Sequence, residues 1–232
     1  MRLRDFTVNE LIAAGLPVSL TIGGLALALA VGLGVPLGVL AALRRRRATD
    51  HALMALAVAG IAIPPYVTAP VLALAFGIYL HWLPVAGWEP GRPAGLVLPV
   101  VALALPTLAY LVRLVRASVL EVLSQPHVRT AESKGLAPRV VLVRHVLPPA
   151  LSPVLGYLGP AAAAVLTGSL VVETVFGLPG MGRFLVQGAL NRDYTLVMGK
   201  VIVYAVIVIG LNLGVDLLQG LLDPRVRHAR RS

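Results

Sequence analysis

The residues best placed to do chemistry form one polar stretch that lies between two long apolar segments. The stretch reads Arg129-Thr130-Ala131-Glu132-Ser133-Lys134-Gly135, and His145-Val146-Leu147-Pro148 follows nine residues later. No Gly-x-x-x-x-Gly-Lys-Ser/Thr sequence occurs, so no P-loop is available to bind ATP. We therefore expect this loop to contact another protein that supplies energy. The alternative is a solvated loop whose arginines only set the orientation of the chain in a membrane.

The other reactive side chains do not gather into a site. The five histidines are dispersed, cysteine is absent and no His-Glu-x-x-His spacing occurs, which excludes disulfides and thiolate metal sites. A membrane enzyme would need a cluster of acids, histidines or a nucleophile near one interface, so we expect neither catalysis nor a cofactor or metal. The net charge of +10 could suggest nucleic acid, but the basic residues lie in short loops. Nucleic acid is therefore not an expected partner.

The composition indicates that the positioning elements are helices in a bilayer. Hydrophobic residues make up 58% of the 232 residues, and mean hydropathy is +0.87, which is more apolar than an ordinary soluble domain. A bilayer core needs about 20 helical residues to cross it. Five segments qualify, at about 16–43, 52–80, 95–112, 150–172 and 196–222. We therefore predict an all-α, polytopic membrane protein with a transmembrane domain at 16–222.

The loops between these spans predict the orientation. Most of the 20 lysines and arginines lie in the loops at 44–47 and 113–149 and in the tail at 223–232. By the positive-inside rule these regions are cytoplasmic, which places the N-terminus outside and the C-terminus inside. Thr7-Val8-Asn9-Glu10 is a capping box, so the external segment 1–15 should contain the start of an amphipathic helix near Val8. A cleaved signal peptide competes with this interpretation, but the apolar run is too long for an h-region.

The loop at 113–149 carries the signals of a short helix. Pro126 suits a first helical position, and Gly135 suits the residue just past the end, where φ is positive. The expected helix is about nine residues long, amphipathic and too short to be stable alone, so it needs a partner surface. Pro138 opens a second helical stretch, expected over Arg139–Leu147 before the fourth span.

The spacing of these residues resembles the EAA loop of binding-protein-dependent ABC importer permeases. The general pattern there is Glu-Ala-Ala, three residues, Gly, nine residues and Ile-x-Leu-Pro. Here Arg129-Thr130-Ala131 stands in place of Glu-Ala-Ala and His145 in place of Ile, which is similar to the peptide-importer branch. The resemblance implies a coupling helix that docks on a cytoplasmic ATP-binding-cassette ATPase. The residues assigned to this contact are Arg129, Thr130, Ala131, Glu132, Lys134, Gly135, Leu147 and Pro148.

A second block, before the last span, resembles the external loop of peptide, nickel and glutathione-type permeases. It consists of Val172-Glu173-Thr174-Val175-Phe176-Gly177-Leu178-Pro179-Gly180-Met181-Gly182 and Asn191-Arg192-Asp193-Tyr194. Its glycines and proline predict tight turns and no helix. The resemblance implies a gate or a docking edge for a substrate-loaded extracytoplasmic binding protein, and the alternative is an ordinary re-entrant loop. The assigned residues are Glu173, Phe176, Gly177, Pro179, Gly180, Gly182, Asp193 and Tyr194.

The resemblance covers essentially the whole chain. The chain most resembles the first of the two permease subunits of an oligopeptide or dipeptide importer. It implies a type I ABC importer fold, peptide transport across the cytoplasmic membrane, and a second, related permease as partner. That subunit normally has a further helix and an external domain before the point where this chain starts. We therefore expect a truncated or misassigned start, or a minimal variant. The alternative function is ion-coupled secondary transport, which predicts several intramembrane ionisable groups.

Asp216 is the only acid that we place well inside a span. A carboxylate at the bilayer centre costs about 2.5–3.5 kcal/mol. Asp216 lies about two helical turns from the middle of its span towards the cytoplasm, where partial hydration or a partner such as Arg113 or Arg116 would reduce that cost, and we expect the pair. Other polar residues in the spans could line a pathway or donate hydrogen bonds between helices. They are Thr107, Tyr110, Thr167, Ser169 and Asn212.

Overall fold

The computed structural model describes residues 7–85, 87 and 93–222, and every regular element in these residues is helical. In chain order the elements are α1 (Val8–Leu43), α2 (Ala48–Ala62), α3 (Pro65–Leu72), η1 (Ala73–Tyr79), α4 (Ala94–Leu123), α5 (Pro126–Ser133), α6 (Pro138–Val141), η2 (Leu142–Val146), α7 (Leu147–Ala150), α8 (Ser152–Val175), α9 (Met181–Leu190) and α10 (Tyr194–Leu222). The segments η1 and η2 are π-helical. The all-α class is confirmed. The beginning of the predicted segment 1–15 and the predicted basic tail 223–232 lie outside the described residues.

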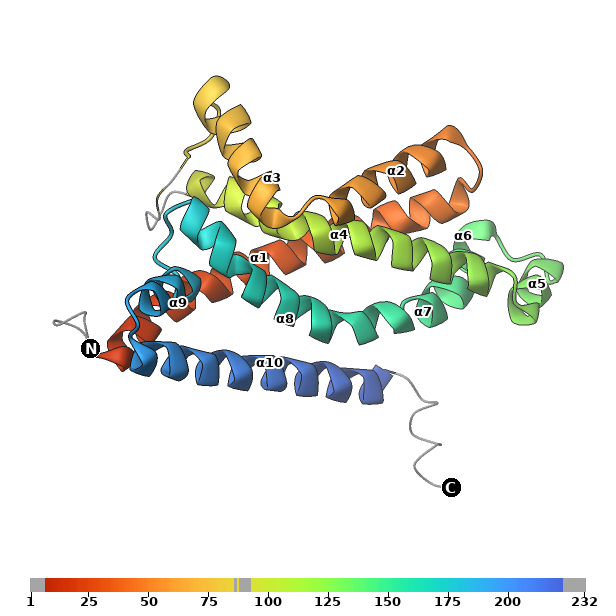
Figure 1. Ribbon diagram of the computed structural model, residues 1–232. Helices are drawn as coiled ribbons and strands as arrows, with labels where there is room; N and C mark the ends of the chain where they lie inside the picture. Colours follow the sequence, from red (N-terminus) through yellow and green to blue (C-terminus); the bar gives the residue numbers. More distant parts are fainter. Residues whose placement is uncertain (1–6, 86, 88–92, 223–232) are drawn as a thin grey trace.

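Four helices in the described residues are long and apolar enough to cross a membrane, namely α1, α4, α8 and α10. The predicted span at 52–80 is wrong as a single helix, because α2 and the α3–η1 segment meet at 104° (Figure 1). The break lies at Pro64, which is extended, with φ −66° and ψ 151°. Pro65 follows it, and proline disfavours helical backbone in the residue before it. With this bent pair counted as one span, the described residues have up to five.

Nearby residues mark the start of α1, and α4 is longer than the span predicted for it. The Thr7 capping box forms as predicted, with Glu10 N–H donating to Thr7 Oγ1 at 3.3 Å and Thr7 N–H donating to Glu10 Oε2 at 2.7 Å. Helix α4 outlasts its predicted span of 95–112 and continues to Leu123. Val115, Val119 and Val122 are buried at helical spacing along this extension. The first part of the loop expected at 113–149 is therefore helix.

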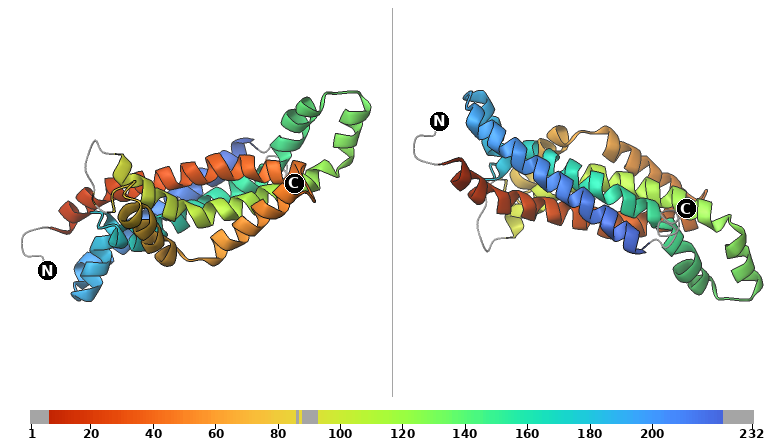
Figure 2. Two further views of the ribbon diagram at one scale, coloured as in Figure 1. Left: turned by 90° about the horizontal axis from the view of Figure 1, so that it is seen from above. Right: turned by 90° about the horizontal axis from the view of Figure 1, so that it is seen from below.

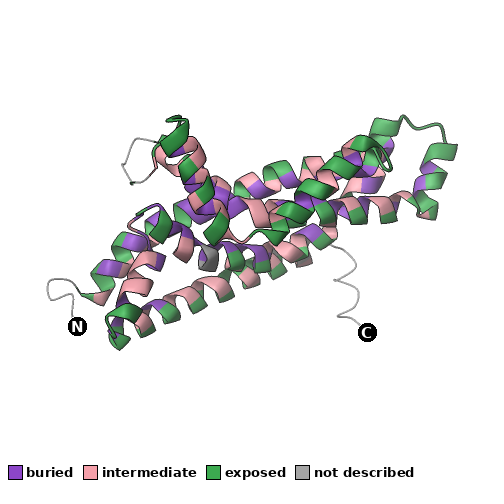
Figure 3. Cartoon of the chain, turned by 45° about the horizontal axis from the view of Figure 1, so that its top comes forward, coloured by how far each residue is buried: buried purple, intermediate pink, exposed green. Residues whose placement is uncertain are grey.

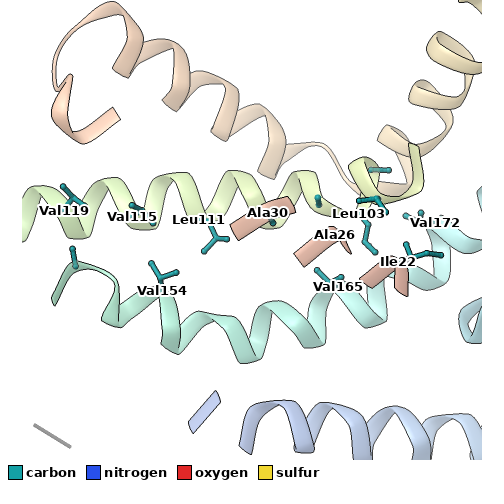
Figure 4. Packing of buried hydrophobic residues seen from close by; sticks show 14 of the residues in the cluster. Ile22, Ala26, Ala30, Leu103, Leu111, Val115, Val119, Val154, Val165 and Val172 are labelled. Carbon is teal, nitrogen blue, oxygen red and sulfur yellow. The ribbon is translucent and has the colours of Figure 1, made fainter. Parts of the chain in front are cut away.

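The core of the bundle lies between α1, α4 and α8 (Figure 4). Helix α1 approaches α4 closely at two glycines. A Cβ added at Gly34 would lie 2.9 Å from Leu111 Cβ, and one at Gly38 would lie 2.6 Å from Val115 Cβ. Small residues thus let the helix backbones pack closely, as is usual where helices associate in a membrane. The buried side chains of this core include Ile22, Ala26, Ala30, Leu103, Leu111, Val115, Val154, Val165 and Val172.

The remaining helices lie at the periphery and at the two ends of the bundle. Helix α10 packs along α8, while α2 and α3 both contact α4 and point away from each other at the break between them (Figure 1). Figure 3 shows that exposed residues recur along the outer helices of the bundle. Figure 2 shows that α5 and α6 project at one end and that α9 lies at the other, and we call these the α5 end and the α9 end. Helix α10 exposes a long row of apolar side chains, and exposed apolar surface of this kind marks a face that meets lipid or a partner. Exposed apolar side chains on α10 include Val201, Ile202, Val206, Ile209, Leu213 and Leu217.

Candidate functional site

At the α5 end, the predicted short helix forms as α5, over Pro126–Ser133. Pro126 occupies the start of the helix, as expected. Gly135 has φ +77°, in the left-handed region, and its N–H donates to the Glu132 carbonyl at 2.9 Å. The helix has 8 residues, close to the predicted length. The start and end signals that define this helix are therefore confirmed.

Helix α5 has one buried face and one exposed face. Val128 and Ala131 are buried and belong to the core cluster. His127 Nε2 lies 3.2 Å from the His145 carbonyl oxygen, which ties α5 to η2. The inner face is thus used within the chain, and the charged outer face stays accessible. The exposed residues among those assigned to ATPase contact are Arg129, Thr130, Glu132, Lys134, Gly135 and Pro148, while Leu147 is half-buried.

A proline in the second helical stretch explains why the backbone carbonyl of His145 is free to contact the His127 ring of α5. This stretch begins at Pro138 with α6, passes through η2 and ends with α7 at Ala150, so it is longer than the predicted Arg139–Leu147. In an α-helix the His145 carbonyl would accept from the residue four positions on, but Pro149 has no N–H. The carbonyl is therefore open to the His127 ring.

At the α9 end, Glu173 in the last turn of α8 is buried, with 0% of its surface exposed. One carboxylate oxygen accepts from Ser19 Oγ of α1 at 2.6 Å. The other accepts from the N–H groups of Gly182 at 2.7 Å and Arg183 at 3.4 Å. Ser19 Oγ in turn accepts from the Met181 N–H at 2.9 Å. Glu173 and Ser19 therefore cap the free N–H groups at the start of α9.

Helix α9 contradicts the prediction that the segment between Glu173 and Tyr194 consists of turns without a helix. Gly180 and Gly182 suggest turns, but in the structure they permit close packing at the helix start. A Cβ added at Gly180 would overlap the Glu173 carboxylate, and one at Gly182 would overlap Leu170 Cα. The prediction fails because the side chains that cap α9 come from α8 and α1, beyond the reach of local sequence.

The predicted turn itself lies between α8 and α9. Gly177 has φ +64°, and the Leu178 N–H donates to the Glu173 carbonyl at 2.8 Å, which closes the turn. Phe176 is buried beneath it and Pro179 is half-buried. Most of the residues assigned to an external docking edge are therefore buried or half-buried.

The turn between α9 and α10 is where this end becomes accessible. Asp193 is buried, and its Oδ1 accepts from the Leu196 N–H at 3.3 Å at the start of α10. Tyr194 beside it is 73% exposed, and Leu190 at the end of α9 is 79% exposed. Of the residues assigned to the docking edge, Tyr194 thus offers the largest accessible side chain.

Sequence reasoning missed Lys200, which lies in α10 and is fully buried. Its Nζ donates to the Met181 carbonyl at 3.1 Å and lies 4.5 Å from the centroid of the Phe184 ring. The available signal was a single lysine in an apolar helix, which in a membrane protein indicates a nearby partner. Together, contacts among Ser19, Glu173, Met181, Gly182 and Lys200 join α1, α8 and α10 to the start of α9.

The predicted pairing of Asp216 is wrong, because Arg116 binds a different acid. Arg116 Nε and Nη2 donate to the two carboxylate oxygens of Asp50, at 2.6 and 2.7 Å. Asp50 Oδ2 also accepts from the Arg46 N–H at 3.0 Å. Asp216 and Arg113 are both exposed. Asp50 lies in the first turn of α2, outside the span predicted at 52–80, so the sequence pattern did not single it out as a partner for Arg116.

Three of the polar residues considered for a pathway make contacts within or between the helices of this chain. Ser169 Oγ donates to the Leu166 carbonyl at 2.7 Å, and Asn212 Nδ2 donates to the Val208 carbonyl at 2.9 Å, each within its own helix. The Tyr110 ring stacks on Tyr157, with centroids 4.2 Å apart. Thr107 is buried, and the side chain of Thr167 lies outside the described part of the structure. These contacts favour a packing role for Ser169, Asn212 and Tyr110.

Comparisons with known proteins place the chain among membrane transport proteins. The family described as binding-protein-dependent transport system inner membrane component matches residues 34–228. The oligopeptide transport system permease protein OppB of Escherichia coli (strain K12) is 46% identical over 227 residues, which cover 98% of this chain and 74% of that protein. The dipeptide transport system permease protein DppB of Bacillus subtilis (strain 168) is 45% identical over 221 residues, covering 95% of this chain and 71% of that protein.

Solved structures support the fold. A chain of the MetNI methionine ABC transporter, solved in inward-facing conformations, aligns with a TM-score of 0.75 over 92% of this chain and 97% of that chain, at 16% identity. A chain of an amino acid ABC transporter solved with histidines aligns with a TM-score of 0.62 over 94% of both chains, at 21% identity. The fold expected for a type I ABC importer permease is therefore confirmed.

Proposed function

The chain belongs to the family of binding-protein-dependent transport system inner membrane components, and from this premise we propose that it is a permease subunit of an ATP-binding-cassette importer for peptides. One observation carries the proposal, namely the 46% identity to an oligopeptide permease over 98% of this chain. The 45% identity to a dipeptide permease supports the same substrate class. Because the relatives are permease proteins and this sequence contains no P-loop, we assign ATP hydrolysis to partner subunits.

Helix α5 is the contact for a cytoplasmic ATPase subunit. It projects from the bundle (Figure 2) and leaves Arg129, Glu132 and Lys134 exposed while its other face is packed against the chain. Gly135 ends it in a conformation that favours glycine. When two ATPases close on ATP, α5 moves with them, and the motion passes through Leu147 and Pro148 to α8. The helices then exchange inward-open and outward-open arrangements because each state offers different contacts.

The α9 end faces the other side of the membrane and meets an extracytoplasmic binding protein. This assignment rests on the basic residues at the α5 end, which the positive-inside rule makes cytoplasmic. The N-terminus is then outside and the C-terminus inside. A second, related permease completes the pathway, and exposed apolar faces such as that of α10 meet it or the lipid. The transport domain corresponds to 16–222.

The test is reconstitution of the tagged chain with its co-purifying subunits in proteoliposomes. We expect two P-loop ATPases and a second permease to co-purify, and uptake of a labelled tripeptide to require both ATP and the binding protein. Uptake by the chain alone, driven by an ion gradient, would overturn the importer assignment.

A substitution at Gly135 tests the role of α5. Gly135→Ala introduces a side chain at φ +77° and should distort the end of α5, so we expect peptide uptake per ATP hydrolysed to fall severalfold. Gly210→Ala is the matched control, because an added Cβ there meets no atom within 4 Å. Equal uptake per ATP in the two variants, at equal amounts of membrane-inserted protein, would contradict a coupling role for Gly135.

A further inference from the structure

Helix α8 connects the two functional ends of the molecule. It starts at Ser152, directly after the α7 segment that leads from α5, and it ends at Val175, just past Glu173. Val154, Val165 and Val172 of α8 are all buried in the core, so the helix is held along its length (Figure 4). Helix α8 is thus a packed element that joins the α5 end to the α9 end.

Helix α9 is fastened to α8 by Glu173 as well as by the chain connection. The Glu173 carboxylate accepts from the Gly182 N–H at 2.7 Å and from Ser19 Oγ at 2.6 Å, with no exposed surface. Charge-assisted hydrogen bonds of this length are the strong ones, and burial excludes the water that would compete for them. The start of α9 therefore moves together with the end of α8.

Lys200 attaches the same point to α10. Its ammonium group donates to the Met181 carbonyl at 3.1 Å, one residue before the N–H that Glu173 accepts. The peptide groups around Met181 are thus held by α1, α8 and α10 at once. Position 182 allows only glycine there, because a Cβ would overlap the Leu170 backbone.

The far end of α9 is the accessible part. Leu190 and Tyr194 expose 79% and 73% of their surface at the turn between α9 and α10. A protein that binds this surface would contact the end of α9, and the start of α9 is bonded to Glu173 of α8 through the Gly182 N–H.

We propose that Glu173 is a positioning residue that transmits contact with the binding protein from α9 into α8, and so to the segment around Leu147 and α5. The inference rests on the proposed importer function. Glu173 itself touches neither the peptide nor the binding protein. Its carboxylate keeps α9 and α8 in one arrangement, so that docking at the α9 end changes the ATPase contact at the α5 end.

The test measures ATP hydrolysis by the complete reconstituted importer as peptide-loaded binding protein is titrated. For Glu173→Gln we expect maximal stimulation to fall on the order of tenfold, within the usual range for coupling between sites. The half-saturating concentration of binding protein should change much less, because the exposed surface at Leu190 and Tyr194 is intact. Tyr194→Ala should show the opposite pattern, with a raised half-saturating concentration.

Two further variants make the test decisive. Thr174→Val is the matched control, since Thr174 is the exposed neighbour of Glu173 and its hydroxyl donates only within α8, to the Leu170 carbonyl. Ser19→Ala removes the hydroxyl that bridges Met181 and Glu173, and decides the matter if Glu173→Gln fails to assemble. Full stimulation in an assembled Glu173→Gln complex, or in Ser19→Ala where that complex does not form, would overturn the inference. Failure of the unsubstituted chain to assemble with ATPases would instead refute the importer function.

Discussion

At the residue scale, the Asp50–Arg116 pair joins two helices near the α5 end. The Asp50 side chain is 3% exposed and that of Arg116 is 25% exposed, so water screens the pair only in part. The guanidinium contacts both carboxylate oxygens, and the third bond to Asp50 comes from the Arg46 N–H. Arg46 has φ +63°, which is unusual for a residue with a side chain. Asp50 therefore fixes the α1–α2 turn and the position of α2 on α4 together.

We predict strong coupling between substitutions in this pair. Asp50→Asn and Arg116→Gln should each lower the free energy of unfolding, because each leaves a partly buried partner without its counter-charge. The double variant should lose about 1–3 kcal/mol less unfolding free energy than the sum of the losses of the two single variants. Denaturant unfolding of the four proteins in detergent measures this difference. Arg113→Gln with Glu121→Gln is the control on the same helix, since both side chains are exposed; additive losses in the Asp50–Arg116 set would contradict the prediction.

At the element scale, helices whose ends are marked by nearby residues could be predicted from the sequence. Thr7 and Glu10 mark the start of α1, and Pro126 and Gly135 mark the limits of α5, because their capping bonds span only a few residues. Helix α9 could not be predicted, since Glu173 and Ser19 cap it from other helices and Gly182 resembles a turn residue. For the same reason the partner of Arg116 was missed. Tertiary contacts of this kind leave no local pattern.

We predict that the bend between α2 and α3 depends on its two prolines. With Pro64→Ala and Pro65→Ala, backbone N–H groups are restored and the residue before position 65 is free to become helical. Each arm spans about 22 Å at 1.5 Å per residue, so straightening should lengthen the distance between their ends by more than about 10 Å. Spin labels at His51 and Tyr79, which are both exposed, report this distance by electron paramagnetic resonance. An unchanged distance would mean that contacts of α3 with α4 and α8 impose the bend.

At the scale of the whole molecule, the two ends differ in charge and in shape. Four exposed arginines, Arg44–Arg47, form the α1–α2 turn near the α5 end. The α9 end presents instead the apolar side chains of Leu190 and Tyr194 around Arg192. An excess of arginine at one end of an apolar bundle sets its orientation in the membrane. Both proposed partner contacts depend on this orientation, since the ATPases and the binding protein lie on opposite sides.

We predict that a membrane-impermeant maleimide will label the two ends differently. The chain contains no cysteine, so a single introduced cysteine is the only thiol to react. Asn191→Cys, at the exposed α9–α10 turn, should be labelled on intact cells or spheroplasts, whereas Ser133→Cys, at the exposed end of α5, should react only after the membrane is permeabilised. Arg45→Cys should behave like Ser133→Cys, because the charge rule places both on the cytoplasmic side. If Ser133→Cys were labelled on intact cells and Asn191→Cys were not, the chain would have the opposite orientation in the membrane. Helix α5 would then face away from any cytoplasmic ATPase.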